Sequence, residues 1–230
     1  MTLLSMSNVQ RYYSTPAGDV KALDGINIEI QQGERVVLLG PSGSGKTTLL
    51  NCLSALDSPT NGTYTFDGVP VPRNDSEAMT RFRRENIGYV FQFFNLLQDL
   101  TVMENILLIQ ELAGQKDPDR AKALLDLVGL SAEADRFPGE ISGGQQQRVA
   151  IARSIAKRPR LLLGDELTGN LDTETSDMVM KALIHACEQE NITAVFVTHD
   201  EGLVKFATRV IRIDSGQIVS DEQQTPTTTE

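Results

Sequence analysis

Residues 40–47 read Gly-Pro-Ser-Gly-Ser-Gly-Lys-Thr, a set of glycines, a lysine and a hydroxyl residue that could bind phosphate groups. An apolar segment, 35–39, precedes them and a helix-like segment, 48–56, follows, as in a phosphate-binding loop (P-loop). Glycines let the backbone curl so that successive N–H groups point at the phosphates of a nucleotide, with the positive end of the next helix behind them. We expect Lys46 to reach the β- and γ-phosphates and Thr47 to ligate Mg²⁺. A turn that only reversed the chain would need neither the Lys-Thr pair nor the flanking elements.

A pair of carboxylates follows a second apolar segment. Residues 161–166 read Leu-Leu-Leu-Gly-Asp-Glu, so a strand would deliver Asp165 and Glu166 at its carboxyl end. That edge of a parallel sheet is where ligands bind. We expect Asp165 to hold Mg²⁺ through water and Glu166 to polarise the attacking water as a general base. Solvated acids at an ordinary strand end are the alternative, and the P-loop earlier in the chain makes it the weaker one.

A third phosphate-binding element is predicted at residues 142–145, Ser-Gly-Gly-Gln, which lead into the helix-like segment 149–153. The serine can cap that helix, and the glycines leave N–H groups exposed at its positive end. Following a P-loop and preceding the carboxylate pair, this segment resembles the Leu-Ser-Gly-Gly-Gln signature of the ATP-binding-cassette (ABC) family, with Ile141 in place of the leucine. The resemblance extends over residues 3–220.

Further motifs of that family follow in order. Gln92 matches the Q-loop glutamine, which senses Mg²⁺ and the attacking water. Residues 170–172, Asn-Leu-Asp, match the D-loop, a short segment that crosses between the subunits of a dimer. His199, after an apolar segment, matches the switch histidine that contacts the γ-phosphate. Tyr13 matches the aromatic residue that stacks on adenine, and the neighbouring Tyr12 is the alternative.

The resemblance implies ATP and Mg²⁺ as ligands and ATP hydrolysis as the reaction. The residues expected to act in catalysis are Lys46, Gln92, Glu166 and His199. The residues expected to hold the metal are Thr47, Gln92 and Asp165. The residues expected to bind the nucleotide are Tyr13, Gly40, Ser42, Gly43, Ser44, Gly45, Lys46, Thr47, Thr48, Ser142, Gly143, Gly144, Gln145 and Asp172.

The chain departs from the family pattern after Glu166. The family usually has proline at the next position, where this sequence has Leu167. Proline would stiffen the turn by fixing φ, so we expect a looser D-loop geometry here. Both carboxylates are present, so hydrolysis is still expected.

Strand patterns alternate with helix patterns along the chain; Ile26, Ile28 and Ile30, for example, alternate with polar residues. Such alternation indicates a mostly parallel sheet covered on both faces. With the resemblance, it predicts an α/β fold: a P-loop NTPase (RecA-like) core with a mostly parallel sheet, an antiparallel β subdomain and an inserted helical subdomain. The expected parts of a single nucleotide-binding domain, 1–230, are an ATP-binding core with the β subdomain at 1–91 and 158–220, a helical subdomain with the signature at 92–157, and a disordered tail at 221–230.

Composition narrows the class of protein. A formal net charge of −10 opposes a surface that wraps nucleic acid, because such binding relies on many Lys and Arg contacts to phosphates. The sequence lacks a run of roughly 18 to 20 apolar residues and a signal-peptide pattern over residues 1–9, so we expect a chain that is neither secreted nor membrane-spanning by itself. Cys52 and Cys187 are far apart in the sequence, which favours reduced thiols in a cytosolic protein.

The resemblance also implies partners. The P-loop and the signature lie too far apart within one ABC subunit to grip a single nucleotide, so two copies are expected to meet head to tail with ATP between them. A membrane permease is expected to contact a cleft near residues 92–97, which Phe91, Phe93, Phe94, Leu96 and Leu97 would line or support. We therefore expect a peripheral protein at the cytoplasmic face of the inner membrane.

Residues 88–97 and 100–105 look like those of ATPases that serve lipoprotein-release and macrolide-export permeases, which couple ATP use mechanically to extrusion. The expected function is the ATPase subunit of such a bacterial transporter. A cassette ATPase of a non-transport membrane complex, such as a regulator of cell division, is the alternative. A soluble cassette acting on DNA or ribosomes and a small-molecule kinase fit less well, the first because of length and charge and the second because of the signature and Gln92.

Overall fold

The computed structural model describes residues 1–16, 18–169 and 171–226. These residues form two compact units. The first contains residues 1–84 and the segment from residue 193 onward, and the second contains residues 85–192. The predicted helical subdomain, 92–157, falls inside the second unit, which also contains strands on either side of it.

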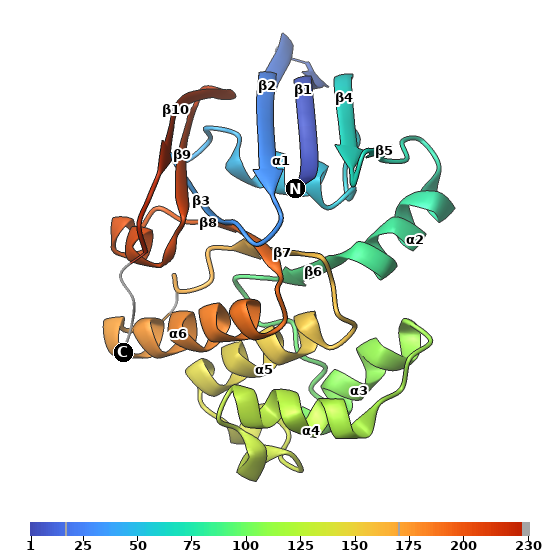
Figure 1. Ribbon diagram of the computed structural model, residues 1–230, viewed down its shortest axis with the longest axis vertical. Coiled ribbons are helices and arrows are strands. Elements are labelled where there is room, and N and C mark those ends of the chain that lie inside the picture. The colour runs from blue at the N-terminus through green and yellow to red at the C-terminus, as the bar shows by residue number, and fades with distance from the viewer. Residues whose placement is uncertain (17, 170, 227–230) are drawn as a thin grey trace. The chain divides into compact units, whose positions relative to one another are not determined.

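An antiparallel sheet with the strand order β2-β1-β4-β5 belongs to the first unit (Figure 1). Its strands are β1 (Thr2–Thr15), β2 (Gly18–Gln31), β4 (Asn61–Phe66) and β5 (Val69–Pro70). The alternation predicted for β2 is confirmed, because Ile26, Ile28 and Ile30 are buried while the residues between them are exposed. Asp67 and Gly68, with φ of 54° and 73°, form the turn from β4 to β5, as Asp-Gly pairs commonly do in hairpins.

A second group of strands in the same unit carries the P-loop. Strand β3 (Arg35–Leu39) pairs in parallel with β8 (Thr193–Val197) and with β9 (Arg209–Asp214). Strand β8 and residues 36–39 of β3 are buried throughout, as expected for strands covered on both faces. Helix α1 (Lys46–Leu53) follows β3, and the short 3-10 helix η3 (Glu201–Phe206) follows β8. Helix α2 (Ser76–Asn86) begins in this unit and ends in the second.

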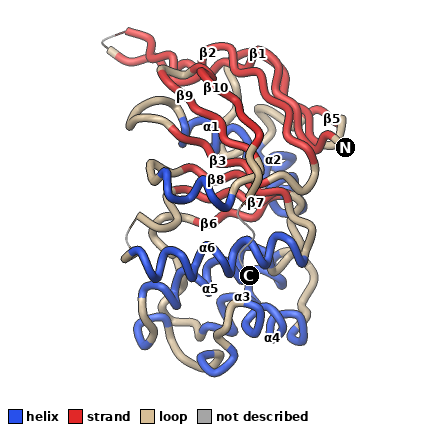
Figure 2. Tube along the Cα trace, turned by 60° about the vertical axis from the view of Figure 1, so that its left-hand side comes forward, coloured by secondary structure: helices blue, strands red, loops and turns tan. Residues whose placement is uncertain are grey.

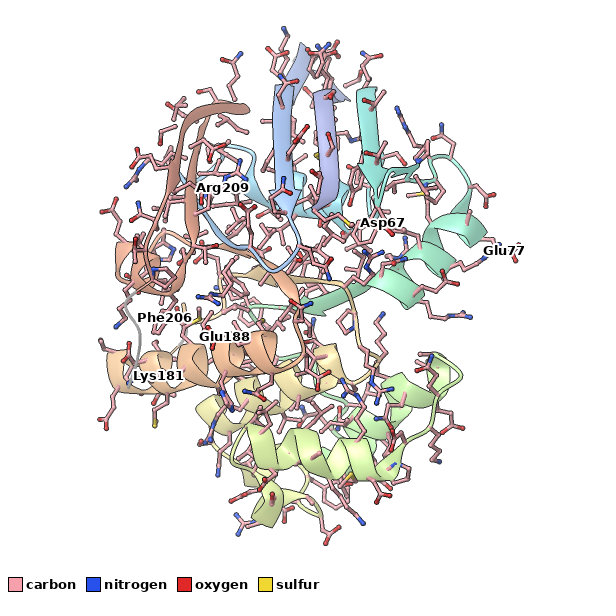
Figure 3. The ribbon with its side chains drawn as sticks, in the orientation of Figure 1. Asp67, Glu77, Lys181, Glu188, Phe206 and Arg209 are labelled. Atoms are coloured by element: carbon pink, nitrogen blue, oxygen red, sulfur yellow. The ribbon has the colours of Figure 1, made fainter. Side chains whose placement is uncertain are left out.

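Strand β10 (Gln217–Gln223) pairs antiparallel with β9, so the expectation of a disordered tail from residue 221 was wrong for residues 221–223. Arg209 on β9, labelled in Figure 3, supplies the physical reason. Its Nε and Nη2 atoms donate to the two carboxylate oxygens of Asp221 at 2.7 Å, and Nη1 contacts Glu34 at 3.1 Å. The Arg209 and Glu34 side chains are largely buried, and the two hydrogen bonds from Arg209 hold the exposed Asp221 in the sheet. Residues 227–230 of the expected tail lie outside the described residues.

The second unit combines a short parallel strand pair with helices. Strand β6 (Ile87–Val90) pairs with β7 (Leu161–Asp165). Its longer helices, blue in Figure 2, are α3 (Val102–Leu112), α4 (Pro118–Leu127), α5 (Gly143–Ile155) and α6 (Thr173–Gln189). Helix α5 packs against α3, α4 and α6. Gly129 follows α4 with a φ of 66°, the left-handed conformation that commonly ends a helix.

One side chain joins the ends of these helices. Arg120 on α4 forms a two-pronged ion pair with Glu190, which follows α6, at 2.9 and 3.0 Å. Its Nε and Nη2 atoms also donate to the backbone carbonyls of Ala156 and Ile155 at the end of α5. The Arg120 side chain is only 10% exposed. A cation at the carboxyl end of α5 satisfies terminal carbonyls and opposes the negative end of the helix dipole.

We predict that Arg120→Ala lowers the free energy of unfolding by about 2 to 4 kcal/mol, because it leaves Glu190 and two helix-terminal carbonyls without their shared donor. Urea denaturation would measure the change. Lys122→Ala, an exposed position on the same helix, is the matched control and should change the free energy by less than about 0.5 kcal/mol. Equal, small effects of both substitutions would contradict a stabilising role for Arg120.

Candidate nucleotide site

The P-loop requires glycine at several positions. Gly40, Gly43 and Gly45 have φ of 156°, 79° and 105°, values that L side chains rarely adopt. A Cβ atom on Gly40 would overlap the carbonyl oxygen of Ile213, and one on Gly45 would overlap that of Ala22. The loop is therefore packed against neighbouring backbone as well as sharply turned, which fixes the directions of its N–H groups.

Polar groups of the P-loop are arranged for an anionic ligand. The Lys46 ammonium donates to the carbonyl oxygens of Gly40 and Pro41, at 2.7 and 2.8 Å, so it lies over the loop itself. The Ser44 hydroxyl is buried and has no hydrogen-bond partner among the described residues. A buried polar group without a partner is costly, and a phosphate oxygen would supply one. Thr47 is exposed at the start of α1, so its hydroxyl is accessible to a metal ion. These residues fit the triphosphate of a nucleotide.

His199 and the two candidate tyrosines belong to the same unit as the P-loop. His199 is exposed directly after β8, beyond the buried Thr198, as the sequence predicts. Tyr12 and Tyr13 are neighbours on β1, so their side chains lie on opposite faces of the sheet. Tyr13 donates to Asp57, whereas Tyr12 donates to Asp24.

The carboxylate pair lies in the second unit. Strand β7 is buried from Leu161 to Gly164 and ends at Asp165, so the apolar strand that delivers the acids is confirmed. Glu166 follows with a φ of 48°, the left-handed region. The N–H of Gly169 donates to the Glu166 carbonyl at 3.2 Å and closes a turn in which Leu167 is only 3% exposed. The backbone therefore reverses immediately after the predicted general base.

Gln92 lies beside that turn. A Cβ atom on Gly169 would be 3.5 Å from the Nε2 atom of Gln92, so the side chain reaches the segment that follows Glu166. Gln92 and Glu166 were predicted as site residues from separate parts of the sequence. In the structure, the Gln92 side chain lies beside the turn that follows Glu166, within one unit.

The signature forms the start of α5. Ser142 is the N-cap: its hydroxyl accepts from the Gln145 N–H at 3.3 Å, while the Gln145 side chain accepts from the Ser142 N–H at 2.8 Å. This reciprocal pair is a capping box, which confirms the predicted cap. Helix α5 then presents Gly143 and Gly144 in its first turn, where backbone N–H groups have no partner within the helix.

Asp172 caps the start of α6. It accepts from the N–H and the hydroxyl of Thr175, at 3.0 and 2.6 Å, and these hydrogen bonds hold the pKa of Asp172 below its usual range. The methyl group of Thr175 lies against Gly144, where a Cβ atom would overlap it. The starts of α5 and α6 are thus in direct contact through Gly144 of the signature and Thr175, which is hydrogen-bonded to Asp172 of the D-loop. Asn170, the first residue of the predicted D-loop, lies outside the described residues.

Arg153 was missed by the sequence analysis. From α5 it donates to the backbone carbonyls of Phe94 and Asn95, at 2.9 and 2.5 Å, and burial lowers its pKa. It therefore ties the signature helix to the segment after Gln92. The only signal was an arginine on a mostly apolar helix, and its carbonyl partners could not be identified without the tertiary structure.

A groove of about 520 Å³ lies along this segment. The residues that line it are Phe93, Phe94, Asn95, Leu96, Gln98, Gly143 and Gln146. Phe93 is 68% exposed, whereas Leu96 is buried. Phe91 and Leu97, also expected at a cleft, are exposed at 37% and 48% but do not line this groove.

The described residues contain neither a membrane-spanning helix nor a cluster of metal-binding side chains. None of their helices has the length and hydropathy needed to cross a membrane. They also contain no cluster of three or more His, Cys, Asp or Glu that could hold a metal ion. The predicted metal ligands, a threonine hydroxyl, an amide and a carboxylate, are consistent with a Mg²⁺ ion held largely by nucleotide phosphates and water.

Comparisons with known proteins agree with this arrangement of motifs. The sequence model of the ABC transporter family matches residues 23–169. The lipoprotein-releasing system ATP-binding protein LolD of Geobacter metallireducens is 42% identical over 96% of this chain and 99% of its own length. The macrolide export ATP-binding/permease protein MacB of Syntrophobacter fumaroxidans is also 42% identical, over 95% of this chain but 31% of its own length. The dimeric structure of the bacterial ABC transporter cassette MJ0796 covers 96% of this chain and 98% of its own with a TM-score of 0.86 and 37% identity.

The chain belongs to the ABC transporter family and has the P-loop cassette fold, with a parallel strand arrangement, an antiparallel sheet and helices. It is the ATP-binding cassette subunit of an ABC transporter, an ATPase that converts ATP to ADP and phosphate.

We predict that Gly144→Ala lowers the midpoint of thermal unfolding by several degrees, corresponding to about 1 to 3 kcal/mol of overpacking. The added methyl group would overlap Thr175, which its hydrogen bonds to Asp172 hold in place. Gly143→Ala is the control, since its Cβ would lie 3.6 Å from the nearest atom, on Phe94, at ordinary contact distance. Calorimetry that shows the same midpoint for both variants would contradict the packing role of Gly144.

Proposed function

We propose that this chain powers a separate membrane permease of the export or extrusion type, in a system similar to the lipoprotein-releasing and macrolide-export systems for which LolD and MacB are named. Similarity to LolD over nearly the full length of both chains carries this proposal. Similarity to MacB supports it, because the match covers only part of that longer ATP-binding/permease protein. The chain would act at the cytoplasmic face of the inner membrane as a peripheral subunit.

Within this proposal, ATP binds first to the P-loop. The N–H groups of residues 40–48, the Lys46 ammonium and the Ser44 hydroxyl would hold the β- and γ-phosphates, and Tyr13 would stack on adenine. Backbone amides at a helix start bind anions without a large positive surface, which suits a chain with a net charge of −10. Thr47, Gln92 and Asp165 would hold Mg²⁺, which neutralises charge that develops on the phosphates.

Hydrolysis requires an activated water molecule. Glu166 would accept its proton as the general base, and Gln92, which lies beside the turn after Glu166, would orient it. His199 would contact the γ-phosphate. The left-handed backbone at Glu166 directs this carboxylate by a sharp turn at the end of β7 rather than by a flexible loop.

The complete site would form between two copies of the chain. The exposed helix start at residues 142–145 of one copy would contact the γ-phosphate held by the P-loop of the other, and Asp172 would lie at the same seam. A two-fold dimer of this kind contains two identical sites. The dimeric structure of the similar cassette MJ0796 supports the proposal. ATP would favour the closed dimer and hydrolysis its opening, because only the triphosphate bridges both surfaces.

The groove at residues 93–98 would receive the permease. Its exposed aromatic side chain, Phe93, can insert into a partner, and Arg153 links the groove to the helix that begins at the signature. Dimer closure could then pull on the permease through rigid elements.

We predict that Glu166→Gln reduces phosphate release about 10²- to 10⁴-fold while ATP binding remains, and that ATP then traps a dimer visible by size-exclusion chromatography with light scattering. Adding Ser142→Arg in the same chain should abolish that dimer without loss of ATP binding. Glu174→Gln removes the same charge from an exposed position on α6 and should behave as wild type. Dimerisation of the double variant would contradict the shared site, and undiminished hydrolysis by Glu166→Gln would exclude Glu166 as the base.

We also predict that Phe93→Ser reduces co-purification of an integral membrane partner about tenfold, the effect of losing an aromatic anchor. Hydrolysis by the isolated chain should stay within about twofold of wild type. Phe137→Ser, at a position 45% exposed elsewhere in the second unit, is the matched control. Recovery of the membrane partner by Phe93→Ser at the wild-type level would argue against docking at this groove.

A further inference from the structure

The side chains of Arg11, Tyr13 and Asp57 in the first unit form a cluster. The Tyr13 hydroxyl donates to Oδ2 of Asp57 at 2.7 Å, and Nε of Arg11 donates to the same oxygen at 2.8 Å. The Arg11 guanidinium lies 4.4 Å from the centroid of the Tyr13 ring, in cation–π contact. Arg11 and Tyr13 are two positions apart on β1, so they share one face of the sheet.

Asp57 connects this cluster to the helix that starts at the P-loop. Its backbone N–H donates to the carbonyl of Asn51 on α1 at 3.1 Å. Its other carboxylate oxygen accepts from the Ser58 N–H at 2.8 Å, which fixes the direction of the side chain. The Tyr13 ring is therefore attached to the carboxyl end of α1, whose amino end begins with Lys46.

The cluster also determines the ionisation states of Tyr13 and Asp57. Burial and the hydrogen bond to Asp57 raise the pKa of Tyr13, so the hydroxyl stays neutral near pH 7. Burial by itself would raise the pKa of Asp57, but hydrogen bonds from Tyr13 and Arg11 outweigh it and lower that pKa, so Asp57 stays ionised. The Arg11 and Asp57 charges offset each other, which leaves an uncharged aromatic platform.

Because Arg11 covers one face of the ring, a flat ligand can stack only on the other. We propose that Arg11 and Asp57 are positioning residues that hold Tyr13 at a fixed distance from the P-loop, with its remaining face presented to the purine of the nucleotide. This inference rests on the proposed ATP site and extends it to residues that bind no part of ATP themselves.

Tyr12 provides an internal comparison. Its hydroxyl donates to Asp24 at 2.5 Å, and the Lys21 ammonium lies 5.3 Å from its ring centroid. This second tyrosine therefore has an acid and a cation similar to those of Tyr13, but on the opposite face of β1 and with the acid on β2 instead of after α1. The backbone of Asp24 is also linked to the P-loop, because its N–H donates to Gly216, whose N–H donates to Ser44. The Tyr13 cluster is joined instead to the helix that follows the P-loop, and we assign the purine platform to Tyr13 on that connection.

The experiment compares ATP with tripolyphosphate, which has the phosphates but no base, by isothermal titration calorimetry with each variant. Asp57→Asn should weaken ATP binding about five- to tenfold and leave tripolyphosphate binding within about twofold, the size expected for one aromatic stacking contact. Tyr13→Phe, which keeps the ring but removes its hydrogen bond to Asp57, should give a similar selective loss of ATP affinity. The double variant Asp57→Asn/Tyr13→Phe should lose no more ATP affinity than either single variant. Arg11→Lys should retain most of the affinity for ATP, while Arg11→Gln should not. Asp24→Asn is the matched control and should bind both ligands as wild type does.

Several results would overturn the inference. Equal weakening of both ligands by Asp57→Asn would mean that Asp57 only supports the fold of α1. Unchanged ATP binding by both Asp57→Asn and Tyr13→Phe would show that the hydrogen bond between Tyr13 and Asp57 does nothing for the base, and a selective loss in Asp24→Asn would assign the platform to Tyr12. Wild-type chain that fails to bind ATP would instead refute the proposed function itself, so the two failures are distinguishable.

Discussion

The backbone conformation of the P-loop is the constraint on which the nucleotide site depends. Gly40, Gly43 and Gly45 occupy φ values that other residues avoid, and the loop packs so closely against the carbonyls of Ile213 and Ala22 that no side chain would fit. A loop held in this way presents its amides before any ligand arrives, so binding does not have to supply the ordering free energy. The buried hydroxyl of Ser44 adds a group whose solvation has already been lost. An acidic chain can thus bind a polyanion through local dipoles.

The helix starts of the second unit follow the same principle. Ser142 with Gln145 caps α5, and Asp172 with Thr175 caps α6, so each start is fixed by short polar side chains. Contact between Gly144 and Thr175 packs the two starts against each other, and Thr175 is in turn hydrogen-bonded to Asp172. At the other end of α5, Arg120 holds the terminal carbonyls, and along its length Arg153 holds residues 94 and 95. Helix α5 is therefore a rigid connection between a candidate ATP contact and a candidate permease contact.

Features with a local cause could be predicted from the sequence. The glycines of the P-loop, the alternating isoleucines of β2, the cap at Ser142 and the apolar strand before Asp165 each depend on neighbours within a few positions, and each was confirmed. The missed features depend on distant partners. Asp57 reads as a turn residue until Tyr13 and Arg11 are placed against it, and Arg153 reads as a helix residue until its carbonyl partners are known. Disorder was wrongly expected at 221–223 because the low hydrophobicity of that segment conceals its pairing with Arg209 and β9.

The leucine at position 167 permits the left-handed backbone conformation of Glu166, the residue before it. A residue that precedes proline is pushed toward extended conformations, whereas Glu166 has a φ of 48°. Leucine imposes no such restriction, so the left-handed conformation of Glu166 costs only its own strain, of order 1 to 3 kcal/mol. Burial of the Leu167 side chain, 3% exposed, is worth a similar amount at about 1.5 to 3 kcal/mol, and the hydrogen bond from Gly169 to the Glu166 carbonyl adds to it. A proline would fix the turn through its own ring; here apolar packing and one hydrogen bond fix it instead, so the direction of the candidate base depends on the core beneath it.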